Sequence, residues 1–246
     1  MKKPIKGAIF DMDGVITDTA RLHAEAWKTL FDEYNRYLAK NRQVKFEPFT
    51  IKIDYPIYID GVPRYQGVQS FLRSRNIDLP YGAPADEPGA ETICGLGNWK
   101  NELFHDILNN TGVDVIDENV DVIIELKDRG IKTAVISSSK NCKEILERAE
   151  LLYLFPVRID GVISQERGLK GKPEPDIFLE AAKELGVTPD ETFIVEDALS
   201  GVEAGVKGGF QYIIGIGDDK KRETMLILGA DEVVTTLMES ELFALI

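Results

Sequence analysis

Cysteine is nearly absent from the 246-residue sequence, which contains only Cys94 and Cys142, in no metal-ligand spacing. A disulfide framework and a structural zinc site are therefore excluded, and a reducing compartment fits. The sequence also lacks any run of about 18 apolar residues that could cross a bilayer. The apolar stretch after Met1-Lys2-Lys3 is too short for an export signal. We expect a cytoplasmic protein that does not bind membranes.

Basic residues are scarce as well. Lys and Arg total 29 against 42 Asp and Glu, which gives a formal net charge of -13. That charge repels nucleic-acid phosphates and anionic lipids, and no run of Lys and Arg makes a local exception, so we expect no nucleic-acid partner. With 43% hydrophobic residues and no low-complexity tract, the composition is that of a folded globular chain.

The order of apolar runs predicts an α/β fold. From about Val115 onward, short Val- and Ile-rich runs alternate with amphipathic stretches, which is typical of βαβ units and a parallel sheet of about six strands. The first of these strands is GAIFDMD, near the start of the chain. The residues in between contain a long amphipathic helix, Thr19 to Leu38, two shorter helices, 68–75 and 99–110, and two long loops, 46–67 and 78–92. We therefore predict a doubly wound, Rossmann-like core formed by residues 1–18 and 112–246. An α-helical cap domain, residues 19–111, is inserted after the first strand.

The strongest motif follows that first strand, where GAIF runs into Asp11-Met12-Asp13-Gly14. Residues two apart project to the same side of an extended chain, so both carboxylates can face the crevice at the carboxyl end of the strand, where open α/β sheets bind ligands. Two acids in one crevice need a cation or a proton. The alternative is a strand that ends in an ordinary Asp-Gly turn.

Three further motifs follow later strands. FIVED ends in Glu196-Asp197, and Asp197 together with Asp11 and Asp13 would supply the few hard oxygen ligands that Mg²⁺ accepts. TAVIS leads into a run of hydroxyls, an ammonium group and helix N-terminal amides that can bind an anion: Ser137, Ser138, Ser139, Lys140 and Asn141. Lys172 precedes a proline-containing helix start. The alternatives are helix capping for Asp197 and the serines, and simple solvation for Lys172.

In this order, the motifs resemble those of the haloacid dehalogenase-like superfamily, most closely its β-phosphoglucomutase-like branch of capped phosphotransferases, over nearly the whole chain. The resemblance implies that Asp11 is the nucleophile that forms an aspartyl phosphate, and that Asp13 is the general acid and then base. It implies that Ser137 and Lys172 hold the phosphoryl oxygens. It also implies a Mg²⁺ site made by the Asp11 carboxylate, the Asp13 backbone carbonyl and Asp197, with Glu196 nearby or acting through water.

The finer match to that branch begins in the segment ITDTARLHAEAW, where the resemblance implies that His23 positions Asp13 and couples it to cap closure. It further implies a substrate-binding set that holds the sugar and a second phosphate: Gly61, Arg64, Lys100, Asn101, Ser138, Ser139, Lys140 and Asn141. Taken singly, a histidine on an amphipathic helix and charges on a loop have ordinary structural explanations. The chain departs from the branch at Asp60, where a Lys would stand, and at Gly67, where a Ser would stand.

The resulting hypothesis is a monomeric, Mg²⁺-dependent enzyme that transfers a phosphoryl group on a small phosphorylated sugar, as in the conversion of β-glucose 1-phosphate to glucose 6-phosphate. The departure at Asp60 favours an alternative, a phosphatase that acts on a related small phosphorylated metabolite. A non-catalytic sugar-phosphate-binding module is a remote third possibility, because it predicts the loss of Asp11 or Asp13 and both are present.

Overall fold

A computed structural model describes residues 3–42, 45 and 47–244 of the chain. The chain divides into two compact units. One consists of Met1–Asp18 and Val113–Ile246 and is called here the α/β unit; the other is Thr19–Gly112 and is called the helical unit. Among the described residues, no helix is both long and apolar enough to cross a membrane.

The α/β unit is built on a six-stranded sheet with the strand order β3-β2-β1-β4-β5-β6, in which every neighbouring pair is parallel. The strand at its centre, β1, is buried along its whole length, as expected for a parallel sheet covered on both faces. This confirms the predicted fold class. The six strands are β1 (Gly7–Asp11), β2 (Lys132–Ile136), β3 (Val157–Ile159), β4 (Thr192–Glu196), β5 (Tyr212–Ile216) and β6 (Glu232–Val234).

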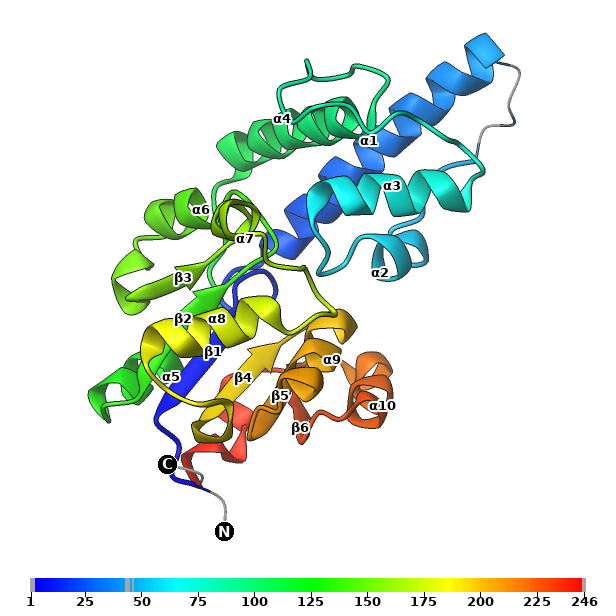
Figure 1. The fold of residues 1–246 in the computed structure, drawn as a ribbon. Helices are drawn as coiled ribbons and strands as arrows, with labels where there is room; N and C mark the ends of the chain where they lie inside the picture. Colours follow the sequence, from blue (N-terminus) through cyan, green and yellow to red (C-terminus); the bar gives the residue numbers. More distant parts are fainter. Residues whose placement is uncertain (1–2, 43–44, 46, 245–246) are drawn as a thin grey trace. The chain divides into compact units, whose positions relative to one another are not determined.

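Helices cover both faces of this sheet (Figure 1). One layer consists of α8, α9 and α10, which pack side by side and bury an apolar cluster against all six strands: α8 packs on β1, β2 and β3, α9 on β4 and β5, and α10 on β6. On the other face, α5 packs on β2 and contacts two short 3₁₀ segments, η1 and η3. The helices are α5 (Asp117–Asp128), α6 (Cys142–Arg148), α7 (Gly161–Arg167), α8 (Asp176–Leu185), α9 (Leu199–Gly208) and α10 (Asp219–Leu228). The 3₁₀ segments are η1 (Leu152–Leu154), η2 (Pro189–Glu191), η3 (Leu237–Glu239) and η4 (Glu241–Ala244).

The helical unit contains no strand among its described residues, in agreement with the sequence pattern. Its core is aromatic: Phe31 packs on Trp27, Phe49 and Phe71 with ring centroids 4.0–5.3 Å apart. Such ring pairs add to the free energy of apolar burial, and they join the helices to the loop that carries Phe49. The helices are α1 (Thr19–Arg42), α2 (Asp54–Tyr58), α3 (Arg64–Ser74) and α4 (Ile93–Thr111).

Some element boundaries differ from the sequence prediction. The expected loop 46–67 contains α2 and the start of α3, and α4 begins at Ile93 instead of 99. The first turn of α4 carries Cys94 and Gly95, which give little apolar periodicity, so the sequence pattern misses this start. Thr92 caps the helix by accepting a hydrogen bond from Gly95 N at 2.9 Å. Residues 157–164, VRIDGVIS, form one of the Val- and Ile-rich runs that predict a strand, but the strand ends at Ile159, because Asp160 accepts hydrogen bonds from two backbone amides and begins α7.

Candidate active site

The predicted catalytic and metal-binding residues lie at the carboxyl ends of three adjacent strands. Asp11 is the last residue of β1, Ser137 follows β2, and Glu196 is the last residue of β4. Because β2, β1 and β4 are neighbours and all point the same way, their ends meet at one edge of the sheet. The chain leaves β1 towards β2 on one side and returns through β4 on the other, so this edge is a topological switch point, where α/β sheets bind ligands.

Lys172 lies at the centre of this edge. Its Nζ is 2.5 Å from Asp11 Oδ1 and also forms an ion pair with Glu196. All three side chains are buried, and Lys172 is only 1% exposed. An ammonium group taken out of water needs such carboxylate partners, so the arrangement explains why a lysine can be buried here.

The buried charges change one another's proton affinity. Burial raises the pKa of Asp11 above its usual value, although Lys172 opposes this. Burial, together with the neighbouring charge of Asp11, raises the pKa of Glu196 to about 7, again against the effect of Lys172. For Lys172 itself, burial lowers the pKa, but Asp11 and Glu196 outweigh it and the net shift is upward. Lys172 therefore stays protonated at neutral pH and favours the ionised form of both acids.

Asp13 lies beside this cluster in the turn after β1, and its Oδ2 accepts a hydrogen bond of 3.1 Å from Ser137 Oγ. Between Asp13 and the next residues the backbone turns at Gly14, which has a φ of +84°. A Cβ atom at this position would clash with the carboxylate of Asp197, so the turn requires glycine for two reasons, its backbone angle and the space.

The segment from Ser137 to Asn141 forms a compact polar loop. Ser137 Oγ accepts a hydrogen bond from Ser139 N at 3.0 Å, and Ser139 Oγ accepts one from Asn141 N at 3.1 Å. Lys140 donates a hydrogen bond to Gln165 of α7. Ser138 lies between these anchors and is half-buried. The N-cap residue of α6 is Asn141, and no side chain forms a cap hydrogen bond there, so the Ser139 bond orders the loop before the helix and does not cap it.

Three acids at this edge could hold a divalent cation. One carboxylate oxygen from each of Asp11, Glu196 and Asp197 lies within 4.8 Å of the others. These are hard oxygen donors of the kind that Mg²⁺ prefers, and a Mg²⁺ ion that keeps some of its waters needs only a few of them. The acids present therefore fit such an ion, and the site carries an excess of negative charge for it to neutralise.

Predicted residues of the helical unit also come together. Arg64 donates a hydrogen bond of 2.7 Å to Asn101 Oδ1. Lys100 is 3% exposed; its Nζ lies 2.5 Å from His23 Nδ1 and 4.9 Å from the centre of the Phe104 ring. The His23 ring stacks on Phe104 at 4.1 Å between centroids. Because an ammonium group can only donate, His23 Nδ1 accepts this hydrogen bond and the ring is neutral.

Burial, followed by the charges of Lys100, Arg64 and His105, lowers the pKa of His23 well below its usual value. Burial also lowers the pKa of Arg64. Gly61 lies in the turn between α2 and α3, with a φ of +73°, and neighbours Asp60, whose amide bonds to the carbonyl of Tyr55 at 3.0 Å. The helical unit thus gathers His23, Lys100, Arg64 and Asn101 around the facing sides of its helices, whereas Gly61 shapes the adjoining turn.

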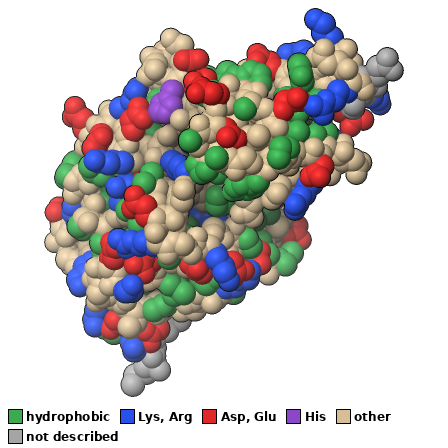
Figure 2. Space-filling view, turned by 45° about the horizontal axis from the view of Figure 1, so that its top comes forward, with side chains coloured by type: hydrophobic (Ala, Val, Ile, Leu, Met, Phe, Trp, Pro, Cys, Tyr) green, Lys and Arg blue, Asp and Glu red, His purple; other side chains and the backbone are tan. Residues whose placement is uncertain are grey.

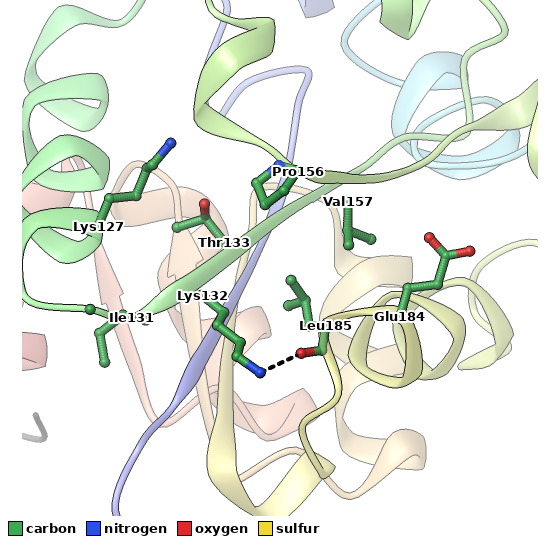
Figure 3. A pocket seen from close by; sticks show the side chains of 9 residues that line it. Lys127, Ile131, Lys132, Thr133, Pro156, Val157, Glu184 and Leu185 are labelled. Atoms are coloured by element: carbon green, nitrogen blue, oxygen red, sulfur yellow. Dashed lines mark hydrogen bonds between the residues drawn. The ribbon is translucent and has the colours of Figure 1, made fainter.

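Neither the cavity nor the charged surface described next offers a second candidate active site. A cavity of about 420 Å³ lies at the amino end of β2, the opposite end from Ser137 (Figure 3). Its two lysines donate to backbone carbonyls, Lys132 to Leu185 at 2.8 Å and Lys127 to Tyr153 at 2.9 Å. On the face shown in Figure 2, basic and acidic side chains are interspersed and no expanse of Lys and Arg gathers.

Comparison with known proteins assigns the chain to a family of phosphate-processing enzymes. The family model described as haloacid dehalogenase-like hydrolase matches residues 5–209. The chain belongs to this family. A relative from Mycobacterium bovis named beta-phosphoglucomutase is 43% identical over 242 residues, which are 97% of this chain and 92% of that protein. A relative from Thermotoga maritima named phosphorylated carbohydrates phosphatase is 28% identical and covers 86% of this chain and 85% of its own length.

Among solved structures, the beta-phosphoglucomutase of Clostridium difficile superposes with a TM-score of 0.76 at 24% identity, covering 98% of this chain and 95% of its own. This likeness shows the shared fold. As a member of the haloacid dehalogenase-like hydrolases, the chain is an enzyme, a phosphotransferase or a phosphatase.

One contact in the site could not be predicted from the sequence. The side chain of Lys221 in α10 donates a hydrogen bond to the backbone carbonyl of Asp197, although the composition around Asp218 and Asp219 is typical of a solvated surface.

Proposed function

We propose that this enzyme transfers a phosphoryl group on a small phosphorylated sugar, in the manner of a β-phosphoglucomutase, through an aspartyl phosphate on Asp11. The observation that carries this proposal is the buried Asp11–Lys172 pair at the end of β1, beside the acids that fit a divalent cation. The name of the relative that is 43% identical supports the choice of substrate class.

Each residue of the α/β unit has a task in this proposal. Asp11 attacks phosphorus, so that an oxygen–phosphorus bond forms to its carboxylate while the bond to the leaving oxygen breaks. Lys172 keeps Asp11 ionised and places a positive charge near the incoming phosphoryl oxygens. Ser137 orients the Asp13 carboxyl group through their 3.1 Å hydrogen bond. Asp13 then gives a proton to the leaving oxygen and later takes one from the hydroxyl that accepts the phosphoryl group.

A Mg²⁺ ion held by Asp11, Asp197 and Glu196, and by the Asp13 carbonyl that the resemblance implies, would supply positive charge to neutralise the phosphoryl oxygens. The loop residues Ser138, Ser139, Lys140 and Asn141 would bind a second phosphate. The helical unit would act as a cap whose Arg64, Asn101, Lys100, His23 and Gly61 bind the rest of the sugar phosphate. Its exclusion of water would direct the phosphoryl group to a sugar hydroxyl.

A phosphatase is the second candidate. The carbohydrate phosphatase from Thermotoga maritima belongs to the same set of relatives. Asp60 also places a negative charge where the mutase branch carries a Lys, and a negative charge beside a second phosphate would weaken its binding. Both functions use the same aspartyl phosphate and differ in whether a sugar hydroxyl or water accepts the phosphoryl group.

The test is to incubate the protein with Mg²⁺ and β-glucose 1-phosphate, primed with glucose 1,6-bisphosphate, and to follow glucose 6-phosphate and free phosphate together. Glucose 6-phosphate without free phosphate supports the mutase, whereas predominant release of phosphate supports the phosphatase. Asp11→Asn should abolish either activity, while Asp219→Asn, at an exposed position of α10, should leave it unchanged. Full turnover by Asp11→Asn would overturn the covalent mechanism.

A further inference from the structure

One contact at the edge of the α/β unit has no part in the proposed chemistry. Lys221, in the first turn of α10, points back to the end of β4. Its Nζ donates a hydrogen bond of 2.8 Å to the backbone carbonyl of Asp197 and lies 3.7 Å from Asp197 Oδ2. The Lys221 side chain is 39% exposed and that of Asp197 is 15% exposed, so the pair lies at the rim of the acid cluster.

The local backbone fixes this position of Lys221. The strand β5 pairs with β4 in register up to Glu196 and Gly215, so the end of β5 lies next to the residue before Asp197. Asp218 begins α10 by accepting hydrogen bonds from Lys220 N at 3.1 Å and Lys221 N at 3.2 Å. A Cβ atom at Gly217 would lie 3.0 Å from Lys221 Cβ, tighter than an ordinary contact, so the glycine lets the turn close on Lys221.

The two lysines of the site form ion pairs with different acids. Lys172 pairs with Asp11 and Glu196, and Lys221 pairs with Asp197. Lys172 is locked in the interior, whereas the ammonium group of Lys221 reaches solvent and can withdraw when another cation approaches the carboxylate. Asp197 is therefore the one acid of this trio whose lysine partner can exchange with a divalent cation.

We propose that Lys221 is a positioning residue that sets the affinity of this site for a divalent cation by competing for the Asp197 carboxylate. The proposal rests on the role of Asp197 as a metal ligand in the proposed function. An ammonium group beside a ligand oxygen repels the incoming ion, and a unit charge a few ångströms from a divalent ion in a largely aqueous setting changes its affinity roughly tenfold. Lys221 thus keeps the cation exchangeable.

The experiment is isothermal titration of Mg²⁺ into the metal-stripped full-length protein. Lys221→Met removes the charge and keeps much of the side-chain length, and Lys221→Arg keeps the charge. Lys220→Met is the matched control, because Lys220 is the exposed neighbour on the same helix. We expect Lys221→Met to bind Mg²⁺ about tenfold more tightly than the wild type. Lys221→Arg and Lys220→Met should stay within about twofold of the wild type, because each keeps a positive charge beside Asp197.

Salt separates this effect from a structural one. Because Lys221 is partly exposed, the gain in Lys221→Met should shrink several-fold when KCl rises from 20 mM to 0.5 M, as screening requires. Unchanged or weaker Mg²⁺ binding by Lys221→Met would overturn the competition by Lys221. Failure of the proposed metal site is a different result: the wild type and Asp197→Asn would then bind Mg²⁺ equally poorly.

Discussion

Replacing Lys172 by methionine tests the most heavily buried charges of the molecule. The substitution keeps the length of the side chain but leaves Asp11 and Glu196 without the ammonium group that lies 2.5 Å from one and in contact with the other. Removing one partner from a buried ion cluster costs about 3–5 kcal/mol, because the remaining charges are left desolvated. We expect the free energy of unfolding of the metal-free protein to fall by about that amount at pH 8.

Lys207→Met is the matched control. Lys207 on α9 also pairs with two glutamates, Glu174 at 3.3 Å and Glu203 at 3.0 Å, but its side chain is 38% exposed. Exposed pairs of this kind contribute little to stability because water screens them, so the same substitution should have little effect there. Urea unfolding followed by far-UV circular dichroism measures both variants. The fluorescence of Trp27 and Trp99 reports separately on the helical unit, which contains both tryptophans of the chain.

The cost of Lys172→Met should also depend on pH. The pKa values of Asp11 and Glu196 are already raised by burial, and the loss of Lys172 raises them further, because Lys172 lowers both. A carboxyl group whose pKa is higher in the folded state contributes stability at low pH and loses it as pH rises through the folded pKa. The variant should therefore be closest to the wild type near pH 5 and furthest from it at pH 8. A loss at pH 8 no larger than that of Lys207→Met would refute the reasoning.

Two further predictions concern other buried groups. The pKa of His23 in the folded protein lies well below its usual value. As pH falls, His23 therefore takes up a proton in the unfolded protein before it does so in the folded one, and stability is lost below about pH 6.5. Between pH 7.5 and 5.5 the wild type should lose about 1.4 kcal/mol more than His23→Gln, measured by tryptophan fluorescence in urea, and equal losses would contradict a neutral His23. Asn119 is fully buried, donates 2.7 Å to the Val15 carbonyl and accepts 2.7 Å from Leu237 N. Asn119→Ala should lower the unfolding free energy by about 2–3 kcal/mol in circular dichroism, and a loss below about 0.5 kcal/mol would count against this role.

The sequence allows the α/β fold and the edge that carries the acids to be predicted, for one physical reason. Buried parallel strands need apolar side chains on both faces, so each reads as a short run of Val and Ile, and the polar residues that follow mark its end. Since all such ends meet at one edge, Asp11, Ser137 and Glu196 can be placed together without knowledge of the strand order. Lys172 joins them from a loop, and only the family resemblance indicates its place.

The sequence pattern fails where one polar residue decides the local structure. VRIDGVIS has the composition of a strand throughout, but the Asp160 carboxylate satisfies two free amides and turns the chain into α7. Contacts between distant side chains are equally invisible. His23 and Lys100 are 77 positions apart, and their hydrogen bond follows from how α1 and α4 pack. No periodicity in either helix encodes that pairing.

Burial decides what each lysine of the site can do. Lys172 and Lys221 both lie beside carboxylates, but water cannot replace the first when it is removed and can replace the second. Stability should therefore depend on Lys172 and hardly on Lys221, whereas the affinity for a divalent cation should respond to Lys221 without unfolding the protein. A site that needs a permanent positive charge and an exchangeable one can obtain both from the same residue type, placed at two depths below the surface.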